Sequence, residues 1–280
     1  MFTRFAKCCK FLHKFRGYEP QPVTPITLYR WLRQFEADER DVAVALLDHV
    51  IFYNKQRLIK ALVNQNAALL DRLKLDGIPI ERVIYVHIDE PGSSSSIMIN
   101  LLRNKANLER LGWNILDASN PKRIVDLIVK LKQVAIVYVD DFLGSGIQFC
   151  QSRDFVSGLF PTSVPEFLLA PCVCEEAYGA LSKRDVEVCA DHIHSKSERP
   201  LHPSSFIFDK SSKKRFQQIS AGIDVNSGMG FFGMAVMVAM YHNAPDNMPL
   251  VLRGNEGQDR FRGILPRTTD LPIPANSHGA

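Results

Sequence analysis

Two adjacent carboxylates, Asp140 and Asp141, stand between an apolar run and a glycine-rich turn. The run at 134–139 has the composition of a strand that is buried on both faces. The turn at 144–146, Gly-Ser-Gly, leads into a helical pattern, so its backbone N–H groups can converge on a phosphate. Adjacent carboxylates beside such a turn suit sugar hydroxyls or a magnesium-bound polyphosphate. The spacing therefore predicts a site for a phosphorylated sugar.

Two other interpretations of this stretch stay open. Paired acids after an apolar strand also occur in receiver domains and in magnesium-dependent phosphatases. The Gly-Ser-Gly sequence is also compatible with an ordinary turn between a strand and a helix. The neighbouring elements bear on this choice, because open α/β sheets bind ligands beyond the carboxyl ends of their strands.

A second loop of similar composition follows the first predicted strand. Residues 82–88 are largely apolar and β-branched, and the chain continues as D-E-P-G-S-S-S-S before an amphipathic pattern at 97–111. A Gly/Ser loop between a strand and a helix is again an anion-site geometry, although it also suits a flexible capped turn. The residues expected to contact the anion are Gly92, Ser93, Ser94 and Ser95.

The pattern around these loops predicts strands that alternate with helices. Further strands are expected at 113–116, 167–173 and 186–190, with helices at 121–132, after 146 and at 175–183. Such alternation produces right-handed βαβ units and a mostly parallel sheet. The fold class expected is therefore α/β.

The N-terminal part of the chain is basic and then helical. Residues 1–17 contain five Lys or Arg, no acid, and Phe at 2, 5, 11 and 15. This segment is either an arm that is packed on its own domain or partly disordered, or one that contacts a partner protein, a nucleic acid or a membrane. Helices expected at 26–35, 37–53 and 56–75 form an N-terminal helical unit, with His49 as a structural residue.

The stretch V-D-D-F-L-G-S-G at 139–146 resembles the signature of type I phosphoribosyltransferases: an apolar strand, two acids, two apolar residues and a small glycine-rich loop. The resemblance implies that Asp140 and Asp141 are the catalytic acids that hold the ribose hydroxyls of phosphoribosyl pyrophosphate. It also implies that the donor's 5′-phosphate is bound by Gly144, Ser145, Gly146 and Gln148.

The chain departs from that signature at two positions. Gly144 stands where a hydroxyl residue is common, and Gln148 stands where the loop normally ends in threonine. With fewer side-chain hydroxyls in the loop, the backbone must supply more of the phosphate contacts. The loop at 92–95 lies where this family places its pyrophosphate loop, and magnesium is expected to enter with the pyrophosphate.

The variant D-D-F-L-G-S-G-I-Q-F is more similar to divergent phosphoribosyltransferase-like proteins of prokaryotic conflict and anti-phage systems, some encoded beside retron reverse transcriptases. Stretches at 31–54, 241–252 and 263–267 resemble the same proteins. The last two correspond to a hood over the acceptor, which implies acceptor contacts from Asn243, Asn247 and Arg267.

This resemblance implies a defence effector that transfers ribosyl phosphate to an unknown acceptor. The alternative is a catalytically inactive subunit that binds a nucleotide or phosphosugar within a defence complex. Partners expected are a phosphoribosyl pyrophosphate-like molecule and, within a complex, a protein or a nucleic acid. The fold expected is a phosphoribosyltransferase-type sheet with an N-terminal helical unit and a C-terminal hood-like region.

The segments expected are a basic arm and linker at 1–24, the helical unit at 25–78, the α/β core at 79–200, the hood-like region at 201–267 and a tail at 268–280. Composition is that of an ordinary globular protein, with 46% hydrophobic residues and a net charge of +4, too mild to indicate nucleic acid by itself. The absence of a secretory signal, six irregularly spaced cysteines and no apolar run long enough for a bilayer indicate a cytoplasmic protein without a membrane span.

A set of cysteines and histidines between 172 and 194 has the residue types of a zinc site. Zinc sites usually have tighter spacings, and cysteines on strands are common in reduced cores. No structural metal is therefore expected. No Walker lysine, G-x-S-x-G elbow, H-E-x-x-H pair or kinase signature competes with the acid-pair loop.

Overall fold

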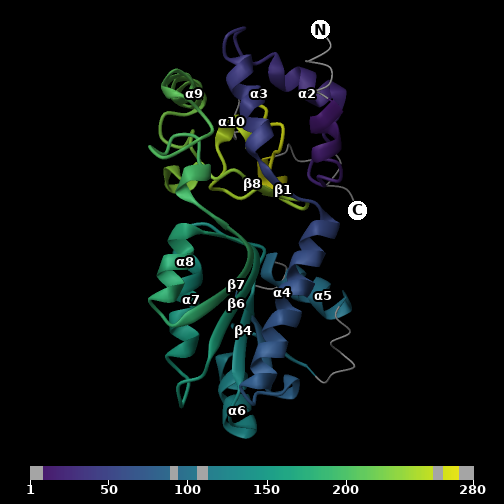
Figure 1. Ribbon diagram of the computed structural model, residues 1–280, viewed down its shortest axis with the longest axis vertical. Coiled ribbons are helices and arrows are strands. Elements are labelled where there is room, and N and C mark those ends of the chain that lie inside the picture. Colours follow the sequence, from purple (N-terminus) through teal and green to yellow (C-terminus); the bar gives the residue numbers. More distant parts are fainter. Residues whose placement is uncertain (1–8, 89–93, 106–112, 255–260, 271–280) are drawn as a thin grey trace, which may run out of the picture. The chain divides into compact units, whose positions relative to one another are not determined.

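The computed structural model describes residues 9–88, 94–105, 113–254 and 261–270 (Figure 1). The chain forms two compact units. The first unit combines residues 1–55 with residues 195–280, and the second comprises residues 56–194. The three helices expected between 25 and 78 are thereby divided, because the third of them belongs to the second unit.

The second unit contains a parallel sheet of six strands. Strand β6 pairs with β4 along its first half and with β5 near its end, while β7 follows its other edge. Beyond β4 the order continues through β2 to β3, the last strand of the path. The prediction of an α/β fold with a mostly parallel sheet is confirmed. The strands are β2 (Val83–His87), β3 (Asn114–Asp117), β4 (Ala135–Val139), β5 (Phe142–Leu143), β6 (Glu166–Cys174) and β7 (Val186–His194).

Helices cover both faces of this sheet. Figure 1 shows α4 and α5 on one side of strands β4, β6 and β7, and α7 and α8 on the other. Right-handed crossovers place the helices on two faces. The connection from β2 to β3 runs in one direction along the sheet, whereas the connections that lead to β4, β6 and β7 run in the other direction. The helices are α4 (Lys55–Leu75), α5 (Ser94–Lys105), α6 (Pro121–Leu131), α7 (Ile147–Ser157) and α8 (Glu175–Ser182).

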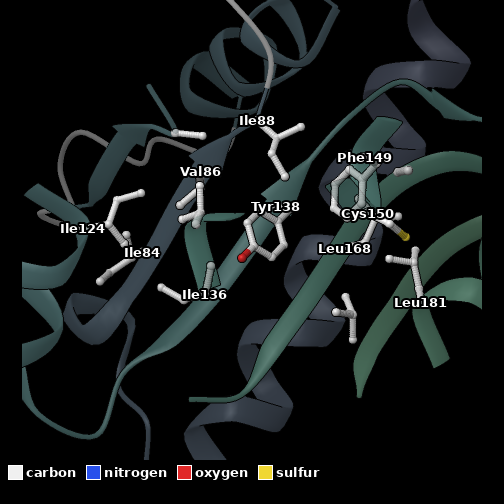
Figure 2. Close-up of a cluster of buried hydrophobic side chains, with 14 of the residues drawn as sticks. Ile84, Val86, Ile88, Ile124, Ile136, Tyr138, Phe149, Cys150, Leu168 and Leu181 are labelled. Atoms are coloured by element: carbon white, nitrogen blue, oxygen red, sulfur yellow. The ribbon is translucent and has the colours of Figure 1, made fainter. Parts of the chain in front are cut away.

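The face under α6, α7 and α8 carries a buried hydrophobic cluster. Figure 2 shows side chains of β2, β4 and β6 meeting side chains of these helices, among them Ile124, Phe149 and Leu181. Tyr138 lies in the middle of this cluster and is fully buried. The strand that leads to the acid pair is therefore fixed by packing before any ligand is considered.

The opposite face is covered by α4, which explains why this helix belongs to the second unit. Its buried positions recur at helical spacing: Leu58, Leu62, Asn66, Leu69 and Leu73. Asn66 is the polar member of this row, and its side-chain oxygen accepts a hydrogen bond of 2.7 Å from the Tyr85 hydroxyl on β2. The buried amide is thus satisfied by the sheet that the helix covers.

In the first unit, a pair of parallel strands links the N-terminal part of the chain to its C-terminal part. Strand β1 (Ile51–Tyr53) pairs with β8 (Val238–Met240), although the sequence pattern predicted a helix through residue 53. Helix α3 (Arg40–His49) ends earlier because Val50 turns extended and an aromatic and β-branched run follows. Helices of this unit also include α2 (Pro25–Leu32), α9 (Lys210–Ile223) and α10 (Leu250–Arg253).

The basic N-terminal segment packs on its own unit from Cys9 onward. Phe11, Phe15 and Tyr18 are buried. The Lys14 ammonium donates to the backbone oxygens of Leu47 and Asp48 at 2.9 and 2.8 Å, at the C-terminal end of α3. Lysine is favourable there because it meets the negative end of the helix dipole. Residues 9–18 therefore pack on their own unit, and a contact of this arm with a partner stays a prediction.

In the ranges that the structure describes, no helix combines the length and the hydropathy needed to cross a bilayer.

Candidate functional site

The acid pair lies at the carboxyl end of β4, where this strand gives way to the short β5. The Asp140 backbone N–H donates to the Leu169 oxygen of β6 at 3.1 Å, so the pair follows directly on the sheet. The connection after β4 leads to β6, whereas the connection after β2 leads the opposite way, to β3. The gap between β2 and β4 is therefore the topological switch point, where open α/β sheets bind their ligands.

Asp140 joins the loops that follow β2 and β4. Its side chain is 7% exposed, and its Oδ1 atom accepts hydrogen bonds from the Ser94 hydroxyl at 3.0 Å and the Asp141 backbone N–H at 2.8 Å. Asp141 is half-buried. The two carboxylates therefore differ: Asp140 stabilises the edge of the site, and Asp141 is the more accessible to a ligand.

The glycine turn needs glycine at its last position. Gly146 has φ +73°, and a Cβ atom built there would lie 2.9 Å from Ala177 Cβ on α8. Helix α7 begins directly after it, and no side chain caps α7 at Gly146. The Ser145 hydroxyl accepts a 3.4 Å hydrogen bond from the Ile147 N–H, while the Gln148 side chain is exposed. This is a tight strand–turn–helix connection whose helix N-terminus can receive an anion.

The serines of the second loop lie partly within helix α5. Gly92 and Ser93 fall outside the described residues. Ser94 and Ser95 form the first turn of α5, which begins three residues earlier than the hydrophobic pattern predicted, since serine favours helix starts. Ser95 is fully buried, whereas Ser94 is half-buried and reaches Asp140.

The side chains expected to contact an acceptor belong to the first unit. Asn247 is 5% exposed, and its amide donates to the Phe231 oxygen at 3.3 Å. The side-chain oxygen of Asn243 accepts from the N–H groups of Ala244 and Thr268 at 3.1 and 3.4 Å. These amides stabilise their own loops. An acceptor role for them, and for the half-buried Arg267, stays a prediction.

A buried polar network lies beneath the acid pair, within the hydrophobic cluster. The Tyr138 hydroxyl donates to Glu166 Oε2 at 2.7 Å, and Arg153 Nε on α7 donates to the same oxygen at 2.8 Å. Burial, followed by the charge of Glu166, raises the pKa of Tyr138, so the phenol stays neutral. Burial also raises the pKa of Cys150 on α7, which argues against a thiolate nucleophile at this position.

Hollows beside the outermost strand, β3, were not predicted from the sequence. One is lined by His87 and Asp117 at the strand ends and by Ser119, Asn120 and Arg123 at the start of α6. The available signal was D-A-S-N-P-K-R at 117–123, an acid at a strand end followed by an Asn-Pro helix start. His87 Nε2 lies 3.9 Å from Asp117 Oδ2.

The sequence comparison identifies one matching family. The sequence model of the PRTase-CE family matches residues 28–267. The match spans most of the chain, including the acid pair, both Gly/Ser loops and the C-terminal stretches. No significant match was found among curated proteins or among solved structures.

Proposed function

The chain belongs to the PRTase-CE family and is a phosphoribosyltransferase-like protein, and from this premise we propose that it binds phosphoribosyl pyrophosphate, or a close analogue, at the acid pair. We propose further that it transfers the ribosyl phosphate group to an acceptor still to be identified.

The observation that carries this proposal is the hydrogen bond between Ser94 and Asp140. It joins the loops after β2 and β4 across the switch point of a parallel sheet. A donor with a phosphate at each end of a ribose needs two anion-binding loops with sugar-binding acids between them. In the described residues the turn at 144–146 and the first turn of α5 both lie beside the acid pair, which supports the proposed ligand.

Different residues bind different parts of the donor. In the proposal, Asp141 binds the ribose hydroxyls, Asp140 holds the two loops together, and the turn at 144–146 with the start of α7 binds the 5′-phosphate. The first turn of α5 faces the pyrophosphate. The carboxylates of Asp140 and Asp141 and the Ser94 hydroxyl are the hard oxygen donors that magnesium prefers, so the site fits magnesium carried by the donor. When bound, magnesium neutralises charge on the departing pyrophosphate.

The proposed reaction breaks the bond between C1 of the ribose and the pyrophosphate oxygen, which leaves with the electron pair. A nucleophilic atom of the acceptor forms the new bond to C1 and releases its proton to solvent or to a base. Positive charge develops on the sugar between these events, and the half-buried carboxylate of Asp141 favours it. The contribution of the protein is therefore positioning and electrostatics.

We also propose that the protein acts in anti-phage defence, as an effector of the retron kind, on the basis of the sequence resemblance described above. The alternative is a subunit that binds the donor without turnover. It is favoured by Gly144 and Gln148, because both remove hydroxyl groups from the phosphate loop.

Release of labelled pyrophosphate from the donor separates these two functions. With magnesium and a panel of nucleobases, nucleosides and oligonucleotides, a transferase releases label in at least one reaction, and Asp141→Asn abolishes the release. Tight binding of the donor with no release under any condition would contradict transfer and support the binding subunit.

A further inference from the structure

Two histidines lie at the carboxyl end of strand β7. His192 and His194 are two residues apart, and side chains at this spacing along a strand point to the same face of the sheet. Their ring centroids are 6.1 Å apart. His194 is fully buried, whereas His192 is half-buried. Two imidazoles placed in this way can converge on one ion.

A carboxylate completes this group four residues further along the chain. Glu198 ends the short 3-10 helix that follows β7. One ligand atom from each of His192, His194 and Glu198 lies within 4.8 Å of the other two. The Glu198 carboxylate is held in place, because Oε2 accepts from the Ser195 N–H at 2.8 Å and from the Ser195 hydroxyl at 3.1 Å. Carboxylates that bind metal ions are commonly oriented by such hydrogen bonds.

The ligand types of this group indicate a transition metal. Two imidazole nitrogens and one carboxylate oxygen are a donor set of catalytic zinc sites and of non-haem iron sites, which leave further coordination positions open. Magnesium and calcium prefer sites built from oxygen alone. Cys172 and Cys174, which pair with the two histidines from β6, are buried, and within the described residues they are not members of the group. The donor set is therefore not the cysteine-rich zinc site that the sequence offered as a candidate.

The group lies at the carboxyl side of the sheet but apart from the acid pair. Strand β6 lies between β4 and β7, so β4 and β7 are two strand spacings, about 10 Å, apart. His192 pairs with Cys172 of β6, whereas Val139, the residue before the acid pair, pairs with Leu169. The histidines therefore extend beyond the level of the acid pair. An ion held at β7 is separate from the magnesium that is proposed to enter with the donor.

We infer that His192, His194 and Glu198 bind one divalent transition-metal ion at the end of β7. The partial exposure of His192 and Glu198 leaves a path by which an ion and its remaining water ligands reach the site. Because the ligands come from the last residues of β7 and from the turn after it, a bound ion fixes the strand end to this turn. The inference does not depend on the proposed transfer reaction.

The test is metal binding to the full-length protein, purified without a histidine tag and freed of metal with a chelator. The probes are Co²⁺, followed by its visible absorption, and Zn²⁺ and Mg²⁺ as competitors. The variants His192→Gln and Glu198→Gln change half-buried side chains, and the fully buried His194 is left unchanged to preserve the fold. His202→Gln is the matched control, because this half-buried histidine lies outside the group and its Nδ1 atom is 2.7 Å from the Ser204 hydroxyl.

We expect the unmodified protein and His202→Gln to bind one equivalent of Co²⁺, which Zn²⁺ displaces and a large excess of Mg²⁺ does not. His192→Gln and Glu198→Gln should each weaken Co²⁺ binding at least about tenfold, because each removes a ligand. Zn²⁺ should also raise the melting temperature of the unmodified protein more than that of these two variants. The inference would be overturned if the unmodified protein bound no Co²⁺, if all four proteins bound it equally, or if Mg²⁺ displaced it.

Discussion

At the scale of single residues, Gly146 is the position of the glycine turn where the backbone conformation restricts substitution most strongly. Gly146→Ala should destabilise the protein by about 1–2 kcal/mol from the left-handed backbone alone, and the overlap with Ala177 adds to this. Gly179→Ala, within α8, is the matched control: no atom lies within 4 Å of the added Cβ, so stability should rise by up to about 1 kcal/mol. Urea denaturation measures both.

No loss of stability for Gly146→Ala, or a gain like that expected for Gly179→Ala, would show that the turn does not have the conformation described here. The residues of this turn, and the acid pair before it, could be predicted because they are contiguous in sequence. The bond from Ser94 to Asp140 could not, because it depends on β2 and β4 being neighbours.

At the scale of elements, the buried network couples the helix behind the glycine turn to the sheet. Glu166 accepts from Tyr138 on β4 and from Arg153 on α7. Glu166→Ala should cost about 3 kcal/mol, because it removes the buried carboxylate partner of Arg153 and leaves only the exposed Asp154 paired with it. Tyr138→Phe should cost only about 1 kcal/mol. The double substitution Glu166→Leu with Arg153→Leu should recover most of the loss from Glu166→Ala.

Equal, small losses for all of these variants in chemical denaturation would contradict a buried, coupled network. Most of the helices that cover this sheet could be predicted from the spacing of hydrophobic residues and from residues that favour helix N-termini. Strand β1 was assigned to a helix because the spacing of α3 continues by chance through residue 53. Strand β8 begins only at Val238 although the apolar run starts at Met234, since Ala235 adopts a positive φ that interrupts the extended backbone.

At the scale of the whole molecule, the second unit has the features of an independent domain. Its sheet is covered by helices on both faces, and α4 supplies one of these covers. We therefore expect the fragment 56–194 to fold, with dispersed amide signals in NMR and a cooperative unfolding transition. The fragment 79–194 lacks α4, exposes the apolar face of β2 and β4, and should aggregate.

If both fragments were unfolded, or both were folded, this role of α4 would be wrong. The two-unit organisation could not be predicted from composition, because the first unit joins residues 9–55 to residues beyond 195. That connection rests on the pairing of β1 with β8, which are far apart in the sequence. The sequence pattern identifies each strand or helix separately but carries little information about such long-range pairing.

The central claim is that the acid pair binds the ribose of a phosphoribosyl pyrophosphate-like donor, and calorimetry with that donor and magnesium tests it most directly. Asp141→Asn should weaken binding by about 1.5–3 kcal/mol, roughly ten- to a hundredfold, through loss of a charge-assisted hydrogen bond. The charge-matched control Asp71→Asn, on the exposed side of α4, should bind like the unmodified protein. Equal affinity of all three proteins, or no binding by the unmodified protein at millimolar donor, would contradict the claim.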